Sequence, residues 1–203
     1  MKGLGAIIVV AAISVAGGAH ADKVTDTMEK AAKAYGSGKL STMVRQLQSA
    51  LARVRKVLAK AYADAMPPAP DGWRAQRARN SGQMIGVMGG GVTVSRRYRP
   101  SSGSGSATAQ LIVDSPLLAT MGAIYANPAM AQNAGYEQFD IDGLNQPAFY
   151  KFDEDRKRGE VVILIGGRVF MKVNVRRVES EDVLKGLAKG WNIKKIKEIA
   201  ELP

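Results

Sequence analysis

The sequence predicts an α+β fold, in which an N-terminal helical hairpin precedes a mostly antiparallel β-sheet with helices packed on it. Apolar residues recur every three or four positions across residues 22–66, and the period shifts toward two beyond a proline-rich break at residues 67–72. The first spacing is typical of one helix face and the second of a half-buried strand. Strands joined by short turns pair in antiparallel fashion, which favours a sheet with its helices on a face.

Residues 1–21 have the pattern of a secretory signal peptide. Lys2 provides the positive start, residues 4–15 are apolar or small, and Ala19-His20-Ala21 matches a small-x-small cleavage site. A retained membrane anchor is the alternative, but a spanning helix needs about 20 apolar residues and this run is shorter. We expect cleavage after Ala21, a periplasmic or secreted protein, and no transmembrane segment in the mature chain.

The composition of the chain limits which metal sites, cofactors and binding partners we expect. His20 is the only histidine, it lies in the segment to be removed, and the chain has no cysteine. We therefore expect no transition-metal site, because the usual ligands are missing, and no cofactor. Removing residues 1–21 removes one of 29 basic residues and none of the 18 acidic ones, which leaves a net charge of +10. Such a charge favours anionic partners, unless it serves solubility alone.

The helical region is expected to be a hairpin of residues 24–35 and 41–65, joined at Gly36-Ser37-Gly38. A lone hairpin buries little apolar surface, so we expect its apolar face to pack on the sheet or on a protein partner. That face on the second helix holds Leu40, Met43, Leu47, Leu51, Val54, Leu58 and Ala61. The prolines at residues 67, 68 and 70 end the helix. The expected domains are the signal peptide 1–21, the hairpin 22–66, the linker 67–72 and an α+β sandwich 73–203.

Alternation and turn residues predict the elements of the sandwich. Its first half is expected to have strands at residues 73–79, 84–87, 92–98 and 107–114, then a helix that starts at Ser115-Pro116 and a short helical piece after Asn127-Pro128. Its second half is expected to have strands 137–141 and 147–152 around Asp142-Gly143, and strands 160–165 and 169–175 around Gly166-Gly167. Residues 180–189 predict a helix that ends at Gly190, and residues 191–202 predict another.

Residues 70–189 resemble a known family in their order of elements. A Pro-x-Gly-Trp entry at residues 70–73 is followed by sheet, helix, paired hairpins and a closing helix. This order resembles the sandwich of the photosystem II extrinsic PsbP-type proteins, and the whole chain resembles uncharacterised secreted bacterial proteins with an N-terminal helical hairpin. The resemblance implies a sandwich fold and brings no catalytic motif with it.

Several short motifs favour turns over ligand sites. Gly89-Gly90-Gly91 lacks the Gly-Lys-Ser/Thr and the helix that follow in a phosphate loop, so it predicts a turn or bulge. Asp140-x-Asp142-Gly143 lacks the further oxygen ligands of a calcium loop and predicts a hairpin turn. For the acidic residues 153–155, two interpretations stay open, a calcium site and a solvated loop.

Basic residues beside aromatic ones are the best candidates for a binding site. Such pairs suit phosphate groups or a membrane surface. The alternative is that the aromatics belong to the core and the charges line solvated faces. The candidates are Arg96, Arg97, Tyr98, Arg99, Trp191, Lys194 and Lys195.

Three functions follow for such a protein. The first is an exported, non-enzymatic binding or accessory protein of the bacterial cell envelope, whose hairpin docks an envelope protein. The second is a basic surface module that binds anionic lipid or polysaccharide. The third is a small carboxylate-dependent hydrolase, disfavoured because no catalytic motif is present. No nucleic acid partner is expected.

We predict that the mature chain begins at Asp22, because the apolar run and the small residues at 19 and 21 direct cleavage there. N-terminal sequencing of the exported protein is the measurement. Recovery of Met1 or Lys2 from membrane-extracted protein would show a retained anchor instead.

Overall fold

The computed structural model describes residues 18–80, 90–116, 118, 125 and 127–203, with side chains from residue 23 onward. The apolar part of the predicted signal peptide lies outside these residues. The chain divides into two compact units, residues 1–54 and 55–203. The division falls inside a helix, whereas the sequence predicts the boundary at the prolines of residues 67–72.

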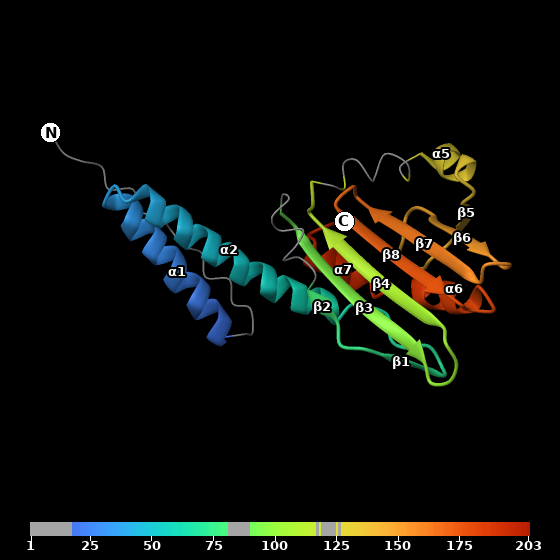
Figure 1. Ribbon diagram of the computed structural model, residues 1–203. Helices are drawn as coiled ribbons and strands as arrows, with labels where there is room; N and C mark the ends of the chain where they lie inside the picture. Colours follow the sequence, from blue (N-terminus) through green and yellow to red (C-terminus); the bar gives the residue numbers. More distant parts are fainter. Residues whose placement is uncertain (1–17, 81–89, 117, 119–124, 126) are drawn as a thin grey trace. The chain divides into compact units, whose positions relative to one another are not determined.

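The first unit contains the predicted helical hairpin (Figure 1). Helix α1 spans Gly18–Gly36 and helix α2 spans Leu40–Ala63, with its last turns in the second unit. The turn between them uses Gly38 at a φ of +70°, a left-handed conformation that glycine adopts without a steric penalty. The buried apolar residues of this unit are small, namely Ala31, Ala34 and Ala50.

The larger apolar side chains of the hairpin are exposed. Leu47, Leu51 and Val54 keep 36%, 47% and 38% of their surface accessible, so they lie outside the core. These values describe the first unit by itself, so the expectation that this face packs on the sheet or on a protein partner stays a prediction. Leu58, further along α2, is half-buried and packs against the core of the second unit.

The second unit is an antiparallel sheet with helices, as the sequence predicts. The strand order is β1-β3-β4-β8-β7-β6-β5, and β2 also pairs with β3. All the described pairs are antiparallel. The strands are β1 Trp73–Ala75, β2 Arg79–Asn80, β3 Val92–Pro100, β4 Ser106–Val113, β5 Glu137–Phe139, β6 Ala148–Asp153, β7 Arg158–Ile165 and β8 Val169–Arg176. The fold class is α+β.

The structure corrects two predicted strand regions. The single strand expected at residues 73–79 is two short strands, β1 and β2, which both pair with β3. Residues 140–147 separate β5 from β6, a longer connection than the expected strands 137–141 and 147–152 leave. Asp142-Gly143 forms the predicted turn inside it, with Gly143 at a φ of +83° and the Leu144 N–H donating to the Ile141 carbonyl at 3.1 Å, and Ile141 is buried in the core. The strand expected at residues 84–87 lies outside the described residues.

The remaining elements follow their sequence signals. Gly166 and Gly167, with φ of +55° and +66°, turn the chain from β7 into β8. Asn127 caps α5, Pro128–Asn133, by accepting a hydrogen bond from the backbone N–H of Ala129. Helices α6, Asp182–Lys189, and α7, Ile193–Ile199, close the chain. The helix expected after Ser115-Pro116 lies largely outside the described residues.

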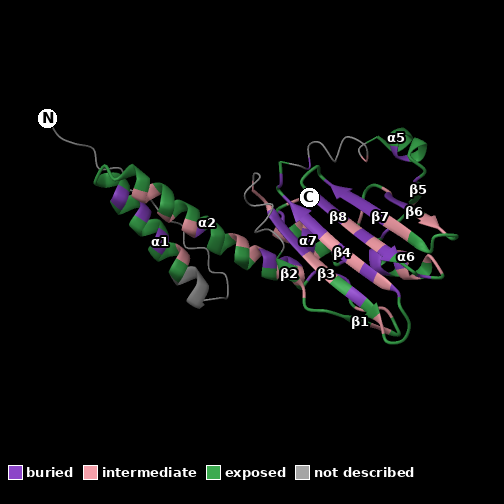
Figure 2. Ribbon diagram, viewed as in Figure 1, coloured by how far each residue is buried: buried purple, intermediate pink, exposed green. Residues whose placement is uncertain are grey.

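One face of the sheet holds the main core, and helices cover it. Alternate residues of the strands on this face pack with Leu184 and Leu187 of α6, Ile193 and Ile196 of α7, and Tyr62 near the end of α2. In Figure 1 helix α7 lies behind the strands, and Figure 2 shows buried positions along the central strands. Because side chains alternate along a strand, the other residues of each strand point to the opposite face.

Hydrogen bonds fix the end of α2 and the proline segment after it to β3. The Tyr98 hydroxyl donates to the carbonyl oxygen of Pro67 at 2.8 Å, and Arg96 donates to Pro67 at 3.2 Å and to Ala63 at 2.9 Å. Burial raises the pKa of Tyr98 to about 12, so its hydroxyl keeps the proton that it donates. Arg96 also places a positive charge at the negative end of the helix dipole.

Candidate functional site: the open face of the sheet

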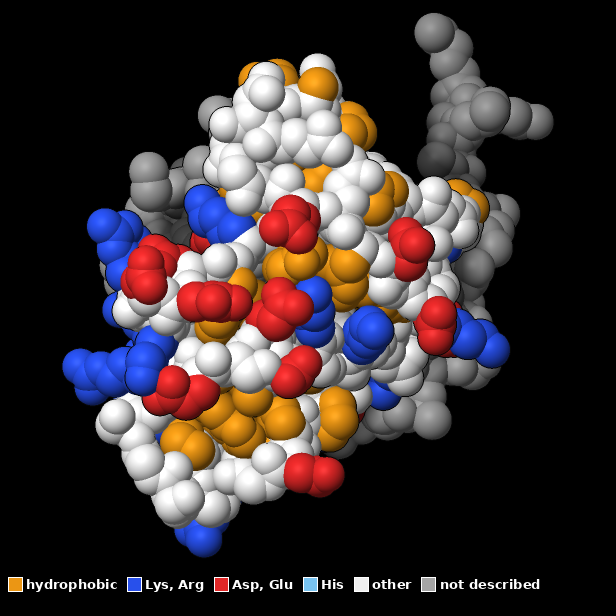
Figure 3. Space-filling view, turned by 90° about the vertical axis from the view of Figure 1, so that its right-hand side faces the viewer, with side chains coloured by type: hydrophobic (Ala, Val, Ile, Leu, Met, Phe, Trp, Pro, Cys, Tyr) orange, Lys and Arg blue, Asp and Glu red, His pale blue; other side chains and the backbone are white. Residues whose placement is uncertain are grey.

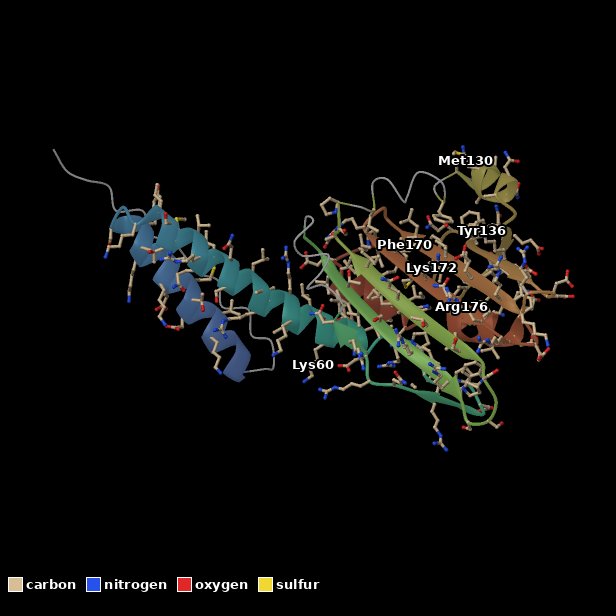
Figure 4. The ribbon with its side chains drawn as sticks, viewed as in Figure 1. Lys60, Met130, Tyr136, Phe170, Lys172 and Arg176 are labelled. Atoms are coloured by element: carbon tan, nitrogen blue, oxygen red, sulfur yellow. The ribbon has the colours of Figure 1, made fainter. Side chains whose placement is uncertain are left out.

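On the second face of the sheet, the apolar cover that the described residues provide lies at one end. There Ile112, Tyr136, Phe149, Phe170 and their neighbours form a small separate cluster. Toward the other end the strands carry polar and charged side chains. Figure 4 follows this change along β8, from Phe170 through Lys172 to Arg176. We call the surface beyond the apolar cluster the open face.

Arginines dominate the open face. The strand register places Arg79 beside Ser95, Arg74 beside Arg99, and Arg158 beside Arg176. Residues paired in this way project from the same side of the sheet. The basic side chains of the open face are Arg74, Arg79, Arg97, Arg99, Lys151, Arg158, Lys172 and Arg176.

Only two carboxylates on the described strands share this face, and both serve several cations. Glu160 contacts Lys172 at 2.6 Å and Lys151 at 3.5 Å. Asp153 lies 3.7 Å from Arg156 and 3.8 Å from Arg158. Among the described residues the arginines at positions 74, 79, 97, 99 and 176 have no ion pair. The open face therefore keeps a surplus of positive charge.

Two hollows lie among these arginines. One of about 180 Å³ is lined by Gln76, Arg77, Arg79, Ser95 and Arg97. The other, of about 220 Å³, is lined by Arg97, Tyr98, Arg99, Ser106, Ala107, Thr108 and Arg176. Both combine guanidinium groups with hydroxyl or amide groups, the donors that bind phosphate oxygens.

Glu160 is the centre of a polar network at the border between the open face and the apolar cluster. It accepts hydrogen bonds from Lys172 and from the hydroxyl of Tyr136, and Lys151 lies over the Tyr136 ring at 4.4 Å. Burial raises the pKa of Glu160, but the hydrogen bonds from Lys172 and Tyr136 and the charge of Lys151 outweigh this effect. The net result is a pKa below its usual value, so Glu160 stays ionised.

The structure separates the predicted site around Tyr98 into two groups. Arg97 and Arg99 are exposed on the open face. Tyr98 is fully buried in the core, and Arg96 is half-buried and bonded to the end of α2. The expectation that Tyr98 presents its ring at a binding surface is therefore wrong, because alternation along β3 turns it toward the helices.

The predicted residues near the C-terminus do not join this face. Trp191 is 4% exposed and belongs to the main core, so its ring cannot act as a surface anchor. Lys194 is exposed and Lys195 half-buried on α7, which covers the opposite side of the sheet. The sequence reasoning missed Arg158, Lys172 and Arg176, and their signal is their alternation with core residues in each strand.

The acidic motifs do not assemble a cation site. No group of three or more acidic or histidine side chains with metal-binding geometry occurs in the described part of the chain. Asp153 instead accepts a hydrogen bond from the backbone N–H of Arg156 at 2.9 Å and faces two arginines. Gly90 and Gly91 have φ of +105° and +87° directly before β3, a backbone conformation that favours glycine, and Gly89 lies outside the described residues.

The charge pattern differs between surfaces of the second unit. Figure 3 shows the end of the sheet near α5, where acidic and basic side chains are interspersed around apolar ones. Balanced charge of this kind keeps a surface soluble without favouring an anion or a cation. Arg74, Arg79, Arg97, Arg99 and Arg176 of the open face, by contrast, have no ion pair among the described residues.

Comparisons with protein-family models, with curated proteins and with solved structures found no match to this chain. The resemblance to PsbP-type proteins therefore stays a prediction. Within the described residues, no helix is both long and apolar enough to cross a membrane.

Glu160→Gln should lower the free energy of unfolding by about 1–3 kcal/mol at neutral pH, because hydrogen bonds to a charged group are lost. The folded-state pKa of Glu160 is below its unfolded value, so its contribution is present above the ordinary glutamate pKa of about 4.3 and is lost as pH falls through the folded-state pKa. Urea denaturation of both proteins between pH 7 and pH 3 measures this. A difference that does not shrink in acid would show that Glu160 contributes through packing and not through its charge.

Proposed function

We propose that this protein is an exported, non-enzymatic component of the cell envelope that binds an anionic lipid or polysaccharide through the open face of its sheet. The single observation that carries the proposal is the group of arginines on this face without a carboxylate partner. Native sheets usually balance exposed charges with opposite ones, so an unbalanced face favours an external anion. Export is supported by the signal-peptide pattern of residues 1–21.

The geometry favours phosphate as the recognised group. The guanidinium of arginine offers a planar fork of donors that matches phosphate oxygens. Ser106 and Thr108 line the second hollow and add hydroxyl donors.

Vesicle binding tests this proposal. The mature protein should co-sediment with phosphatidylglycerol-containing vesicles and not with phosphatidylcholine vesicles, and salt should weaken the binding. Replacing Arg97 and Arg99 together by serine should weaken binding about thirtyfold at low salt, since each cation near an anionic surface contributes about 1 kcal/mol.

The matched control replaces Lys194 and Lys195 by serine. This variant loses the same two charges from α7, on the other side of the sheet. It should bind nearly as well as the native protein. Equal loss in both variants would mean that net charge alone drives binding, and native protein that ignores anionic vesicles and anionic polymers at low salt would overturn the proposal.

A second candidate function rests on the exposed apolar stripe of α2, namely Leu40, Val44, Leu47, Leu51 and Val54. Their steps of four and three residues form a seam that fits another helix. Helix α2 has five basic residues and no acidic one, so charge complementarity favours a protein partner with an acidic amphipathic helix over a second copy of this chain.

A photo-crosslinking residue in place of Leu51 should join the exported protein to such a partner in intact cells. Ala52, exposed beside it on the same helix, is the control position and should give little product. Crosslinks to a second copy, or equal crosslinking from both positions, would contradict a heterologous helix partner.

A further inference from the structure

Arginines form a row across one end of the open face. In the register, Arg74 of β1 lies directly opposite Arg99 of β3, and Arg176 of β8 lies directly opposite Arg158 of β7. On β4, between the two pairs, Ser106 lies opposite Arg176. Extending the β3–β4 register by one residue beyond Tyr98 and Ala107 places Ser106 beside Arg99 as well. The row therefore crosses five neighbouring strands.

The two arginine pairs are unfavourable in the free protein. Like charges directly opposite each other on neighbouring strands repel, and native sheets usually avoid this arrangement. Asp153 reduces the repulsion only in the second pair, because its carboxylate lies 3.8 Å from Arg158. It shares its charge with Arg156, which lies at 3.7 Å. The first pair has no carboxylate partner among the described residues. An anion between the two guanidinium groups would turn repulsion into attraction.

We propose that each arginine pair binds one phosphate group, and that the ligand is a phosphodiester polymer that occupies both pairs at once. This inference rests on the proposed function and specifies its ligand. Neighbouring strands are about 4.8 Å apart, so the centres of the two pairs lie about 14 Å apart, three strand spacings. Two phosphates of one flexible chain can span this distance, whereas a single monophosphate can occupy only one pair.

The middle of the row supports a continuous chain. The 220 Å³ hollow is lined by Arg99, Ser106 and Arg176, and it therefore connects the inner arginine of each pair. The hydroxyl groups of Ser106 and Thr108 in this hollow can donate hydrogen bonds to the polymer between its two bound phosphates.

The surroundings of the row favour a polymer without bases. Proteins that bind single-stranded nucleic acid combine a basic groove with aromatic side chains on which the bases stack. Among the described residues, the aromatics on this side of the sheet belong to the apolar cluster with Phe149 and Phe170, at the opposite end of β8 from Arg176. Tyr98, the aromatic residue next to Arg99, faces the core. A sugar- or glycerol-phosphate chain fits these conditions.

The experiment compares long-chain polyphosphate with inorganic phosphate as probes for the mature native protein. Polyphosphate should bind at least about a hundredfold more tightly, because occupying the second pair becomes an intramolecular step. It should also raise the melting temperature of the protein, as a ligand of the folded state does. Equal affinity for the two probes would overturn the proposal.

Three double variants locate the site. Arg74→Ser with Arg99→Ser, and Arg158→Ser with Arg176→Ser, each remove one pair and should weaken polyphosphate binding at least about tenfold. Arg77→Ser with Arg79→Ser removes two arginines that line the other hollow and should weaken it less than about threefold. Without ligand, the first variant should melt no lower than the native protein, because it removes a repulsion.

A charge-preserving variant separates guanidinium geometry from charge. Arg99→Lys with Arg176→Lys keeps the net charge but loses the planar fork, so it should weaken polyphosphate binding while its vesicle binding changes little. If all three serine variants lose affinity equally, the row is not a site, although a diffuse basic face can still bind anions. Native binding to anionic vesicles without binding to polyphosphate would also overturn the row and leave the proposed function standing.

Discussion

The side chains that each face of the sheet presents depend on which residues of β3 point toward the helices. Hydrogen bonds from β3 to Pro67, just after α2, fix this orientation. Pro67 accepts hydrogen bonds from Tyr98 and Arg96, and these two residues are two apart in β3. They must therefore share the face that the helices cover. Their neighbours Arg97 and Arg99 must then point the other way. A slip of one residue would expose the Tyr98 ring and bury two unpaired guanidinium groups, which is far costlier than the native arrangement.

The sequence predicts local structure well where a local signal exists. Gly166-Gly167 marks the β7–β8 turn because both residues need positive φ, and Asn127-Pro128 marks the start of α5 by its cap. Asp142-Gly143 likewise marks the turn between β5 and β6, but the sequence did not predict that β5 ends at Phe139 and β6 begins at Ala148, because strand ends depend on pairing between strands. The split between β1 and β2 likewise depends on where each pairs with β3.

The open face could be predicted only in part, since both sets of alternating residues in β3 contain arginine. A charged side chain normally marks the solvent face, but Arg96 is drawn inward by the carbonyls of Ala63 and Pro67. Arg158 and Arg176 are far apart in the chain, and only the β7–β8 register makes them neighbours. Aromatic neighbours in the sequence were a misleading guide, because Tyr98 and Trp191 contribute their rings to the core.

Within the described residues helix α1 runs from Gly18, so it contains residues 19–21 of the predicted cleavage site. Cleavage after Ala21 would shorten the helix and place a new positively charged α-amino group at the end where the helix dipole is already positive. That start is unfavourable for the first turn, while Asp22 and Asp26 nearby would partly offset it. Processing would thus fray the beginning of α1 and move its stable start toward Thr25 or Asp26, which can cap a helix. The hairpin of the exported protein would then be shorter on one side than the full chain suggests, and α2 would extend beyond its neighbour.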